Sequence, residues 1–297
     1  MSTPPGLFPA IVAAMLSACG SGVAPPLVDV PFTLHRNQIL LEVNIADQPH
    51  FVLLDSGGNP SVFDLATALE AGLGVDTTRF GLATGAGNEE VRIYPLEAVR
   101  VGLAGKNLGT VEAIAMDLTE ISERLGHPLA GILGYSFLKG RVVQVDYPDL
   151  RFRLLPDDWT RDGIDATSGR EVLRIPLVLA GTDPLVENFF VNGERVPSTL
   201  DTGSSLVFEL YGGLERAGRL GITPADTSSV LGAQGESERF TATADSLRLG
   251  PFMAVDQEIA IDPEGHDRVE RGNLGNGFLK QFVLTLDYAN KALRIER

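Results

Sequence analysis

Short apolar runs separated by turn-forming residues recur along most of the chain. Segments 40–45 and 51–54 predict two strands joined by a polar turn. Segments 188–191 and 195–200 predict a second pair, joined at Asn192-Gly193, a dipeptide that favours hairpins because both residues tolerate positive φ. Short strands bounded by such turns are typical of an all-β fold.

Both strand pairs end in an Asp-Ser/Thr-Gly motif, Asp55-Ser56-Gly57 in the first and Asp201-Thr202-Gly203 in the second. The same features follow each motif: an apolar run at helical spacing (65–73 and 210–220), a glycine-rich segment (84–87 and 231–235), a short strand ending in glycine (99–102 and 247–250), an element ending in Phe-Leu-Lys (131–139 and 272–280) and a strand with Asp-Tyr (145–147 and 286–288). Equal order and nearly equal spacing indicate a duplicated unit.

The duplication predicts two lobes, at residues 28–156 and 171–297, joined by a polar linker at 157–170. A chain of 297 residues is long enough for two lobes that each have a core. Pairing of the two lobes within one chain predicts a monomer. The alternative that stays open is that each lobe dimerises separately.

The overall charge is acidic, since 39 Asp and Glu residues against 24 Lys and Arg residues give a formal net charge of −15. A surface of that sign repels phosphate backbones, so nucleic acid is not an expected partner. The single cysteine excludes an intrachain disulfide and a thiol nucleophile in the lobes. The four histidines are scattered and Gly-x-Ser-x-Gly is absent, so we expect no metal, no cofactor and no nucleophile-elbow serine.

A single Asp-Ser/Thr-Gly is more often an ordinary turn, because Asp and hydroxyl side chains cap backbone amides and glycine permits tight geometry. Here Asp55 and Asp201 each directly follow an apolar strand, which brings the carboxylate to the end of a buried strand. A buried carboxylate needs hydrogen-bond donors, and the hydroxyl and glycine amide that follow can supply them. Two such units related by a pseudo-twofold axis would bring the carboxylates face to face.

Two adjacent carboxylates cannot both ionise cheaply, so they share a proton and titrate as a pair. The ionised member can deprotonate a water held between them, while the protonated member donates to the carbonyl oxygen of a substrate amide. A peptide bond would then be hydrolysed through a tetrahedral intermediate without a covalent enzyme adduct. The repeated motif therefore predicts this chemistry at Asp55 and Asp201.

Several motifs carry a resemblance to a known family: Leu-Leu-Asp-Ser-Gly (53–57), Gly-Ala-Gly (85–87), Gly-Ile-Leu-Gly-Tyr-Ser-Phe-Leu (131–138), Val-Asp-Tyr (145–147), Leu-Asp-Thr-Gly-Ser-Ser (200–205) and Asn-Leu-Gly-Asn-Gly-Phe-Leu (273–279). With them the chain resembles the bacterial retropepsin-like aspartyl peptidases. Together the halves are similar to a single-chain, pepsin-like, bilobal acid-protease fold. The resemblance implies two pseudo-twofold-related, closed β-barrel-like lobes with a few short helices.

The resemblance also implies an aspartic endopeptidase in which Asp55 and Asp201 are catalytic and a polypeptide substrate lies in the cleft between the lobes. The residues that it implies as support for the active-site loops are Ser56, Gly57, Thr202, Gly203 and Ser204. A hydrophobic-hydrophobic-Gly element is expected to pack beneath each loop, at 132–134 and 273–275.

The sequence departs from the family pattern in three places. Gly58 stands where Ser, Thr or Ala is usual, Asn273 is polar where an apolar residue is expected, and no tyrosine lies in segment 84–88. Segments 84–88 and 232–235 are candidate flaps on glycine content, although plain hairpin turns explain them equally well. The alternative function is therefore a catalytically silent peptide-binding lipoprotein that keeps the fold.

An apolar run at residues 7–18 is too short to span a bilayer as a helix and is typical of a signal peptide. Leu16-Ser17-Ala18-Cys19 resembles a bacterial lipobox, in which cleavage precedes an acylated cysteine. The resemblance implies a signal peptide over 1–18, lipidation of Cys19, a tether over 19–27 and a place in the cell envelope, facing the periplasm or the surface. Membrane contact is then expected only through this lipid anchor. An incidental cysteine in the leader is the alternative.

Overall fold

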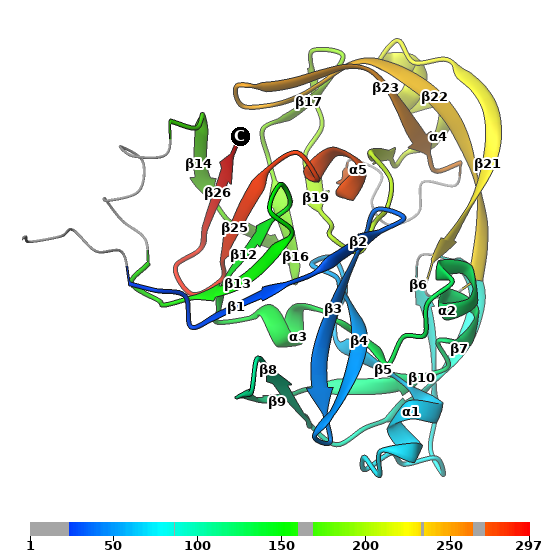
Figure 1. Cartoon of the computed structure of the whole chain (residues 1–297). Helices are drawn as coiled ribbons and strands as arrows, with labels where there is room; N and C mark the ends of the chain where they lie inside the picture. The colour runs from blue at the N-terminus through cyan, green and yellow to red at the C-terminus, as the bar shows by residue number, and fades with distance from the viewer. Residues whose placement is uncertain (1–23, 86, 160–168, 233–234, 264–270) are drawn as a thin grey trace, which may run out of the picture.

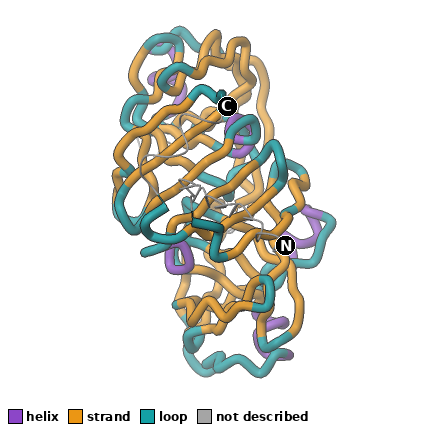
Figure 2. Tube along the Cα trace, turned by 60° about the vertical axis from the view of Figure 1, so that its left-hand side comes forward, coloured by secondary structure: helices purple, strands orange, loops and turns teal. Residues whose placement is uncertain are grey.

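The computed structural model describes residues 24–85, 87–159, 169–232, 235–263 and 271–297. Strands dominate this part of the chain, and its helices are short (Figure 1). Figure 2 shows an elongated molecule in which strands run through both ends. The predicted signal peptide, Cys19 and residues 160–168 of the predicted linker lie outside the described residues.

The first half forms a ten-stranded sheet that holds Asp55 at its centre. Its strand order is β6 (Gly81–Gly85), β7 (Gly87–Pro95), β10 (Ala113–Met116), β5 (Ser61–Asp64), β11 (Gly131–Leu133), β4 (Gln48–Leu54), β3 (Gln38–Ile45), β8 (Val99–Leu103) and β9 (Lys106–Val111), with β2 (Thr33–His35) paired to β3. Three helices accompany it: α1 (Leu65–Glu70), α2 (Thr119–Leu125) and α3 (Tyr135–Leu138).

The second half forms another ten-stranded sheet, which holds Asp201. Its order is β15 (Val178–Ala180), β16 (Asp183–Val186), β19 (Ser198–Leu200), β24 (Gly272–Leu274), β20 (Phe208–Leu210), β23 (Phe252–Ile261), β22 (Gly235–Leu249), β17 (Phe189–Val191) and β18 (Glu194–Arg195), with β21 (Pro224–Gly232) paired to β22. Helices α4 (Gly213–Arg219) and α5 (Asn276–Leu279) belong to this half.

The two sheets share a common order of six strands. The order β7-β10-β5-β11-β4-β3 in the first sheet corresponds to β22-β23-β20-β24-β19-β16 in the second. The directions also agree, because β4 with β11 and β5 with β10 are parallel, as are β19 with β24 and β20 with β23. The duplication read from the sequence is thus present in the strand topology.

Two details of the expected fold are corrected. Each ten-stranded sheet has two ends among the described strands, so the structure shows no closed barrel of the kind the resemblance implied. The strand expected at 195–200 is divided into β18 and β19, because Pro197 has no backbone N–H to donate to a neighbouring strand. The helices expected at 65–73 and 210–220 are present as the shorter α1 and α4.

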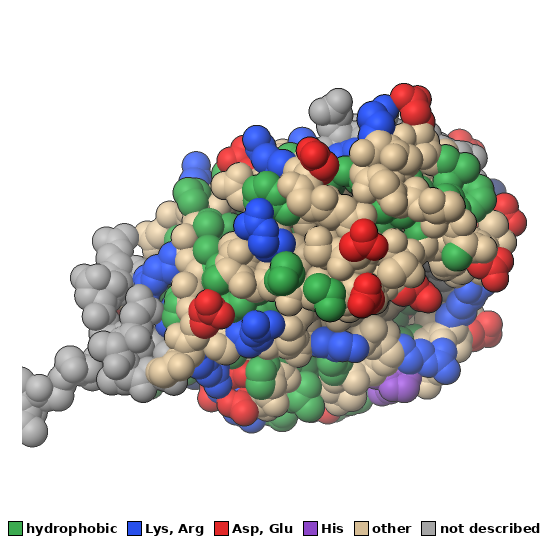
Figure 3. Space-filling model, turned by 90° about the horizontal axis from the view of Figure 1, so that it is seen from above, with side chains coloured by type: hydrophobic (Ala, Val, Ile, Leu, Met, Phe, Trp, Pro, Cys, Tyr) green, Lys and Arg blue, Asp and Glu red, His purple; other side chains and the backbone are tan. Residues whose placement is uncertain are grey.

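The surface carries charges of both signs. On the face seen from above in Figure 3, acidic and basic side chains are interspersed among polar and apolar ones. Exposed ion pairs such as Lys139–Glu112, with an N–O distance of 2.8 Å, add little stability because water screens them. Among the helices of the described segments, none has the length and apolar character needed to cross a membrane.

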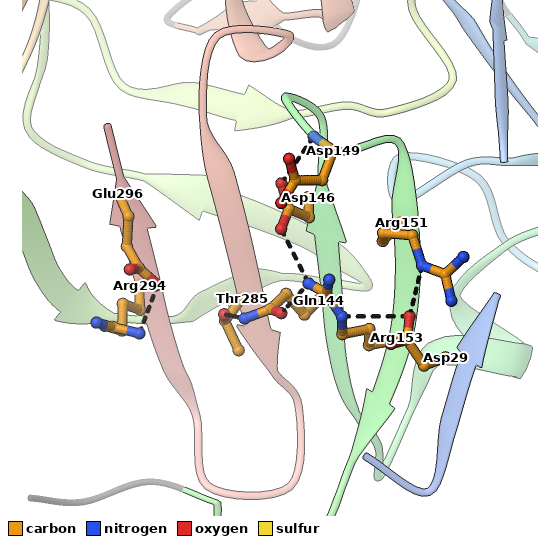
Figure 4. Close-up of polar contacts among 9 residues, drawn as sticks. All are labelled: Asp29, Gln144, Asp146, Asp149, Arg151, Arg153, Thr285, Arg294 and Glu296. Atoms are coloured by element: carbon orange, nitrogen blue, oxygen red, sulfur yellow. Dashed lines mark hydrogen bonds and ion pairs between the residues drawn. The ribbon is translucent and has the colours of Figure 1, made fainter. Parts of the chain in front are cut away.

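A six-stranded sheet joins the two halves, with three strands from each. Its order is β1 (Val28–Pro31), β13 (Arg151–Leu155), β12 (Val142–Asp146), β25 (Val283–Asp287), β26 (Ala292–Glu296) and β14 (Val172–Pro176). Antiparallel β12 and β25 meet at its centre, where Gln144 lies opposite Thr285 and donates from Nε2 to Oγ1 at 3.1 Å (Figure 4). The halves are thus joined by a continuous backbone ladder.

The two faces of this joining sheet differ in chemistry. Val143, Val145 and Leu284 point into the main core, which extends into both halves. The opposite face carries polar side chains that form a chain of contacts across the strands (Figure 4). Arg153 donates to Gln144 Oε1 and to Asp146 Oδ2, each at 2.9 Å. Alternation of apolar and polar residues along each strand produces these two faces.

Asp64 begins α1 and ties it to the segment that leads into α2. Its Oδ2 accepts from the backbone N–H of Thr67 at 2.9 Å, which is an N-cap contact, and its Oδ1 accepts from Leu118 N at 3.1 Å. Asp64 is 9% exposed, so these donors would find little water if its carboxylate were removed.

We predict that Asp64→Ala lowers the free energy of unfolding by about 2 kcal/mol, because it removes a helix cap and leaves a buried N–H unpaired. Urea denaturation measures the change. Asp76→Ala is the matched control, since Asp76 Oδ1 makes a similar contact with Thr78 N at 3.0 Å in an exposed turn. Equal losses in both variants would contradict the role assigned to burial.

Candidate active site

Asp55 and Asp201 each lie just beyond the end of a central strand, β4 and β19. The backbone N–H of Asp55 donates to the carbonyl of Leu133 in β11 at 2.9 Å, and that of Asp201 donates to Leu274 in β24 at 2.9 Å. Each aspartate is therefore held by the parallel strand next to its own. The sheets, rather than free loops, fix the positions of both residues.

The hydroxyls of Ser56 and Thr202 connect the two aspartate loops reciprocally. Ser56 Oγ donates to Leu200 O at 2.7 Å, and Thr202 Oγ1 donates to Leu54 O at 2.9 Å. Each hydroxyl also accepts from the backbone N–H of the other residue, at 3.0 Å in both cases. Because both side chains are buried, these four bonds satisfy groups that water cannot reach.

The two carboxylates lie next to each other across this junction. Asp55 Oδ1 accepts from Gly57 N at 2.9 Å, and Asp201 Oδ1 accepts from Gly203 N at 2.8 Å. A Cβ atom on Gly203 would lie 2.4 Å from Asp55 Cγ, and one on Gly57 would lie 2.8 Å from Asp201 Cγ. Only glycine leaves room for the opposing carboxylate, which explains the third residue of both motifs.

The electrostatics of the pair favour one shared proton. Burial raises the pKa of Asp55 well above its ordinary value of 3.8, and the charge of Asp201 and a hydrogen bond with it raise this pKa further. The amides of Gly57 and Gly58 act in the opposite direction because they donate to the carboxylate. Two carboxyls in contact, one of them hard to ionise, can act as an acid and a base at the same pH.

The structure gives a physical reason for Gly58, where the family pattern has a larger residue. A Cβ atom there would lie 2.6 Å from Asp55 Oδ2, so a side chain would displace the carboxylate. The hydroxyl of Ser204, at the corresponding place in the second half, accepts from Leu206 N at 3.4 Å, and the Ser204 backbone N–H donates to the carbonyl oxygen of Asp201 at 3.3 Å. Its hydroxyl therefore stabilises its own loop.

The segments that follow β11 and β24 pack beneath the aspartate loops. The backbone N–H of Tyr135 donates to Gly58 O at 2.7 Å, and that of Asn276 donates to Ser204 O at 2.8 Å. A Cβ atom on Gly134 would lie 2.3 Å from Gly58 O, so this close approach requires glycine. The packing expected of segments 132–134 and 273–275 is what the structure has.

Four polar residues near the site were not anticipated from the sequence as contributors. Asn276 Nδ2 donates to Thr202 O at 2.7 Å, and Asn273 Nδ2 donates to Asp201 Oδ2 at 2.7 Å. From the β2–β3 turn of the first half, Asn37 Nδ2 donates to Ser205 O at 3.0 Å and Gln38 Nε2 to Gly203 O at 2.8 Å. The polar character of Asn273 was the one signal available; the β2–β3 turn had none.

The two candidate flap segments lie at the tips of hairpins. Segment 84–88 includes the end of β6 and the start of β7, and segment 232–235 the end of β21 and the start of β22, while residues 86 and 233–234 lie outside the described residues. Strand β7 contacts β21 and β22, and Figure 1 shows the long second hairpin extending toward β7. The two halves therefore meet at these hairpins as well as at the joining sheet. That the hairpins act as flaps stays a prediction.

Comparison with known proteins adds one finding. Residues 41–137 match the family model described as Aspartyl protease. The match includes Asp55 and the element at 132–134, and it confirms the resemblance to aspartyl proteases for the motifs of the first half. No curated protein matches the chain. In the part of the chain that the structure describes, no group of three or more His, Cys, Asp or Glu side chains is placed to hold a metal ion.

We predict that Thr202→Val lowers the free energy of unfolding by about 2–4 kcal/mol, because it leaves Leu54 O and Ser56 N unpaired in a buried place. Thr199→Val is the matched control. Thr199 is 1% exposed in the adjacent strand, and its hydroxyl has no hydrogen-bond partner among the described residues. If chemical denaturation gave the same loss of unfolding free energy for both variants, the reciprocal hydrogen bonds would add no stability beyond that of a buried hydroxyl.

The raised pKa of Asp55 predicts a pH-dependent stability. Between 3.8 and that raised pKa the folded chain binds more protons than the unfolded chain, so stability falls as pH rises through this window. Asp55→Asn removes the effect. We therefore expect the melting temperature of the variant to exceed that of the parent by an amount that grows from about pH 4 to pH 7. Parallel melting curves for the two proteins across this range would contradict the shared-proton description.

Proposed function

We propose that the chain, whose residues 41–137 match the Aspartyl protease family model, is an aspartic endopeptidase in which Asp55 and Asp201 activate a water molecule. The observation that carries the proposal is the reciprocal junction of the two halves, which holds two carboxylates in contact at the ends of buried strands. A protein without acid–base chemistry has no evident use for two carboxylates that repel each other at one site.

The proposed reaction uses both carboxyls at once. The ionised carboxylate takes a proton from water, and the water oxygen attacks the carbonyl carbon of the substrate amide. The protonated carboxyl donates to the carbonyl oxygen, which gives a neutral tetrahedral intermediate. The carboxyl that took the water proton then donates it to the amide nitrogen, the other carboxylate takes back a hydroxyl proton, and the C–N bond breaks to release an acid and an amine. The amides of Gly57 and Gly203 hold the inner carboxylate oxygens in place during both steps.

The substrate is proposed to be an extended polypeptide that binds between the halves, below the hairpins β6–β7 and β21–β22. Extended chains bind such sites through backbone hydrogen bonds, and side-chain pockets add selectivity. We further propose that the active form is a monomer, since one chain supplies both aspartates and the joining sheet connects the halves that hold them. Attachment to the cell envelope through Cys19 remains part of the proposal on sequence grounds alone.

The test is cleavage of a mixed peptide library by the parent protein, Asp55→Asn and Asp201→Asn between about pH 3 and pH 7, followed by mass spectrometry. We expect either substitution to reduce the cleavage rate at least about a hundredfold, with the fold intact by circular dichroism. Asp47→Asn is the matched control, because Asp47 lies in the exposed β3–β4 turn at a positive φ of 62° that Asn also tolerates.

Cleavage that survives both substitutions would show that the site is elsewhere. If the parent binds peptides from the library but cleaves none of them, the catalytically silent peptide-binding protein becomes the better description.

A further inference from the structure

Asn273 makes the surroundings of the two carboxylates unequal. It lies in β24 and is 4% exposed, and its Nδ2 donates to Asp201 Oδ2 at 2.7 Å. Asp201 thus receives one donor on each oxygen, since its Oδ1 accepts from Gly203 N. The donor on Oδ2 is a side chain, so it can be replaced without changing the backbone.

The corresponding position in the first half is apolar. In β11 that position is Ile132, which pairs with Leu53 and Val62 and packs in the smaller apolar cluster of that half. Its side chain cannot donate a hydrogen bond to Asp55. The two halves therefore share a strand arrangement around their aspartates, but they differ in this side chain as well as in the residue after each motif, Gly58 or Ser204.

A donor at this distance has different effects on the two protonation states of a carboxyl. An ionised oxygen accepts the N–H as a charge-assisted bond, which is stronger and shorter than a neutral one. Once protonated, the carboxyl gains less from the same donor. The contact from Asn273 therefore stabilises the ionised form of Asp201 relative to its acid form. Asp55 accepts from the backbone amides of Gly57 and Gly58, and apart from Asp201 itself no side-chain donor to Asp55 is found among the described residues.

Two tyrosines near the pair do not reverse this inequality. Burial and then the charge of Asp201 raise the pKa of Tyr147, so its phenol stays neutral, and its hydroxyl donates to Asn276 Oδ1. Burial, followed by the charge of Asp55, raises the pKa of Tyr288. Neither tyrosine adds a charge to the site in the pH range where the carboxyls titrate.

The other charged groups near Asn273 lie on the next strands. Glu209 is the β20 neighbour of Asn273 and forms an ion pair with Arg239, whose Nη1 also lies 3.8 Å from Asp262 Oδ1. Burial raises the pKa of Glu209, and the charge of Arg239 and its hydrogen bond act in the opposite direction.

We propose that Asn273 is a positioning residue that fixes where the shared proton lies. By donating to Asp201 it keeps Asp201 as the carboxylate that deprotonates the water, and it leaves Asp55 as the acid that donates to the substrate carbonyl. This assignment rests on the proposed peptidase function. It adds to it a role for a residue that differs from the apolar one expected at this place.

The test combines one measurement that needs no catalysis with one that does. In the full-length protein labelled with ¹³Cγ-Asp, the Asp201 carboxyl resonance is assigned with Asp201→Asn and then titrated in the parent and in Asn273→Leu. We expect the Asp201 midpoint to rise by about one pH unit in Asn273→Leu, since a charge-assisted bond is lost. The acid limb of the pH dependence of kcat/KM should rise by a similar amount.

Two further variants keep the result interpretable. Asn273→Asp has the same shape and loses the donor when ionised, so it should raise the midpoint even if the leucine variant folds poorly. Thr199→Val changes the β19 neighbour of Asn273 at the same depth and should leave the midpoint within about 0.2 units, because no hydrogen bond to the pair is lost.

An unchanged Asp201 midpoint in both Asn273 variants would overturn the role of Asn273, as would an equal shift in Thr199→Val. If the parent cleaves no peptide, the NMR titration still decides this question, so failure of the peptidase proposal is seen separately.

Discussion

The carboxylates of Asp55 and Asp201 repel each other whenever both are ionised, and the residues around them hold them together against that repulsion. Reciprocal bonds between Ser56 and Thr202 lock the two loops. Gly57 and Gly203, the glycines of the two motifs, leave space for the opposing carboxylate, and their amides donate to the inner oxygens. The repulsion between the two carboxylates prevents both from ionising, so one of them keeps a proton that is available for acid catalysis.

The positions of the two aspartates are fixed by neighbouring strands and also by structure farther away in the molecule. The parallel strands β11 and β24 hold the backbone of the two aspartates, and the segments after these strands support the loops from below. Farther away, the joining sheet aligns the halves through β12 and β25. A displacement of one half relative to the other would have to break this backbone ladder, so the carboxylates keep their spacing.

Much of this arrangement could be predicted because local pattern and duplication agree. The turn at Asn192-Gly193, the apolar strands before each aspartate and the repeated order of motifs indicated two related halves. The division of the strand before Asp201 was predictable in principle, since Pro197 cannot donate within a sheet, but an apolar run concealed it. Closed barrels were expected by resemblance, whereas the described sheets have free ends.

The contacts that depend on long-range register could not be predicted. Nothing in the local sequence around Asn37 and Gln38 indicates that a turn of the first half would bind the aspartate loop of the second. Asn273 was recognised only as a departure from an apolar pattern, because its partner becomes evident once β24 is aligned with β19. Gly58 likewise gained an explanation only from the distance between its backbone and Asp55.

The central claim is that the two halves form one pair that shares a proton. The most direct test is reaction of the protein at about pH 6 with a small diazoacetyl ester, which esterifies carboxyls in their protonated form, followed by peptide mapping. Ordinary aspartates are ionised at this pH and react poorly. The account predicts one ester in total over Asp55 and Asp201, because the second carboxyl holds no proton. Two esters in the same chain, or none at either residue, would contradict it.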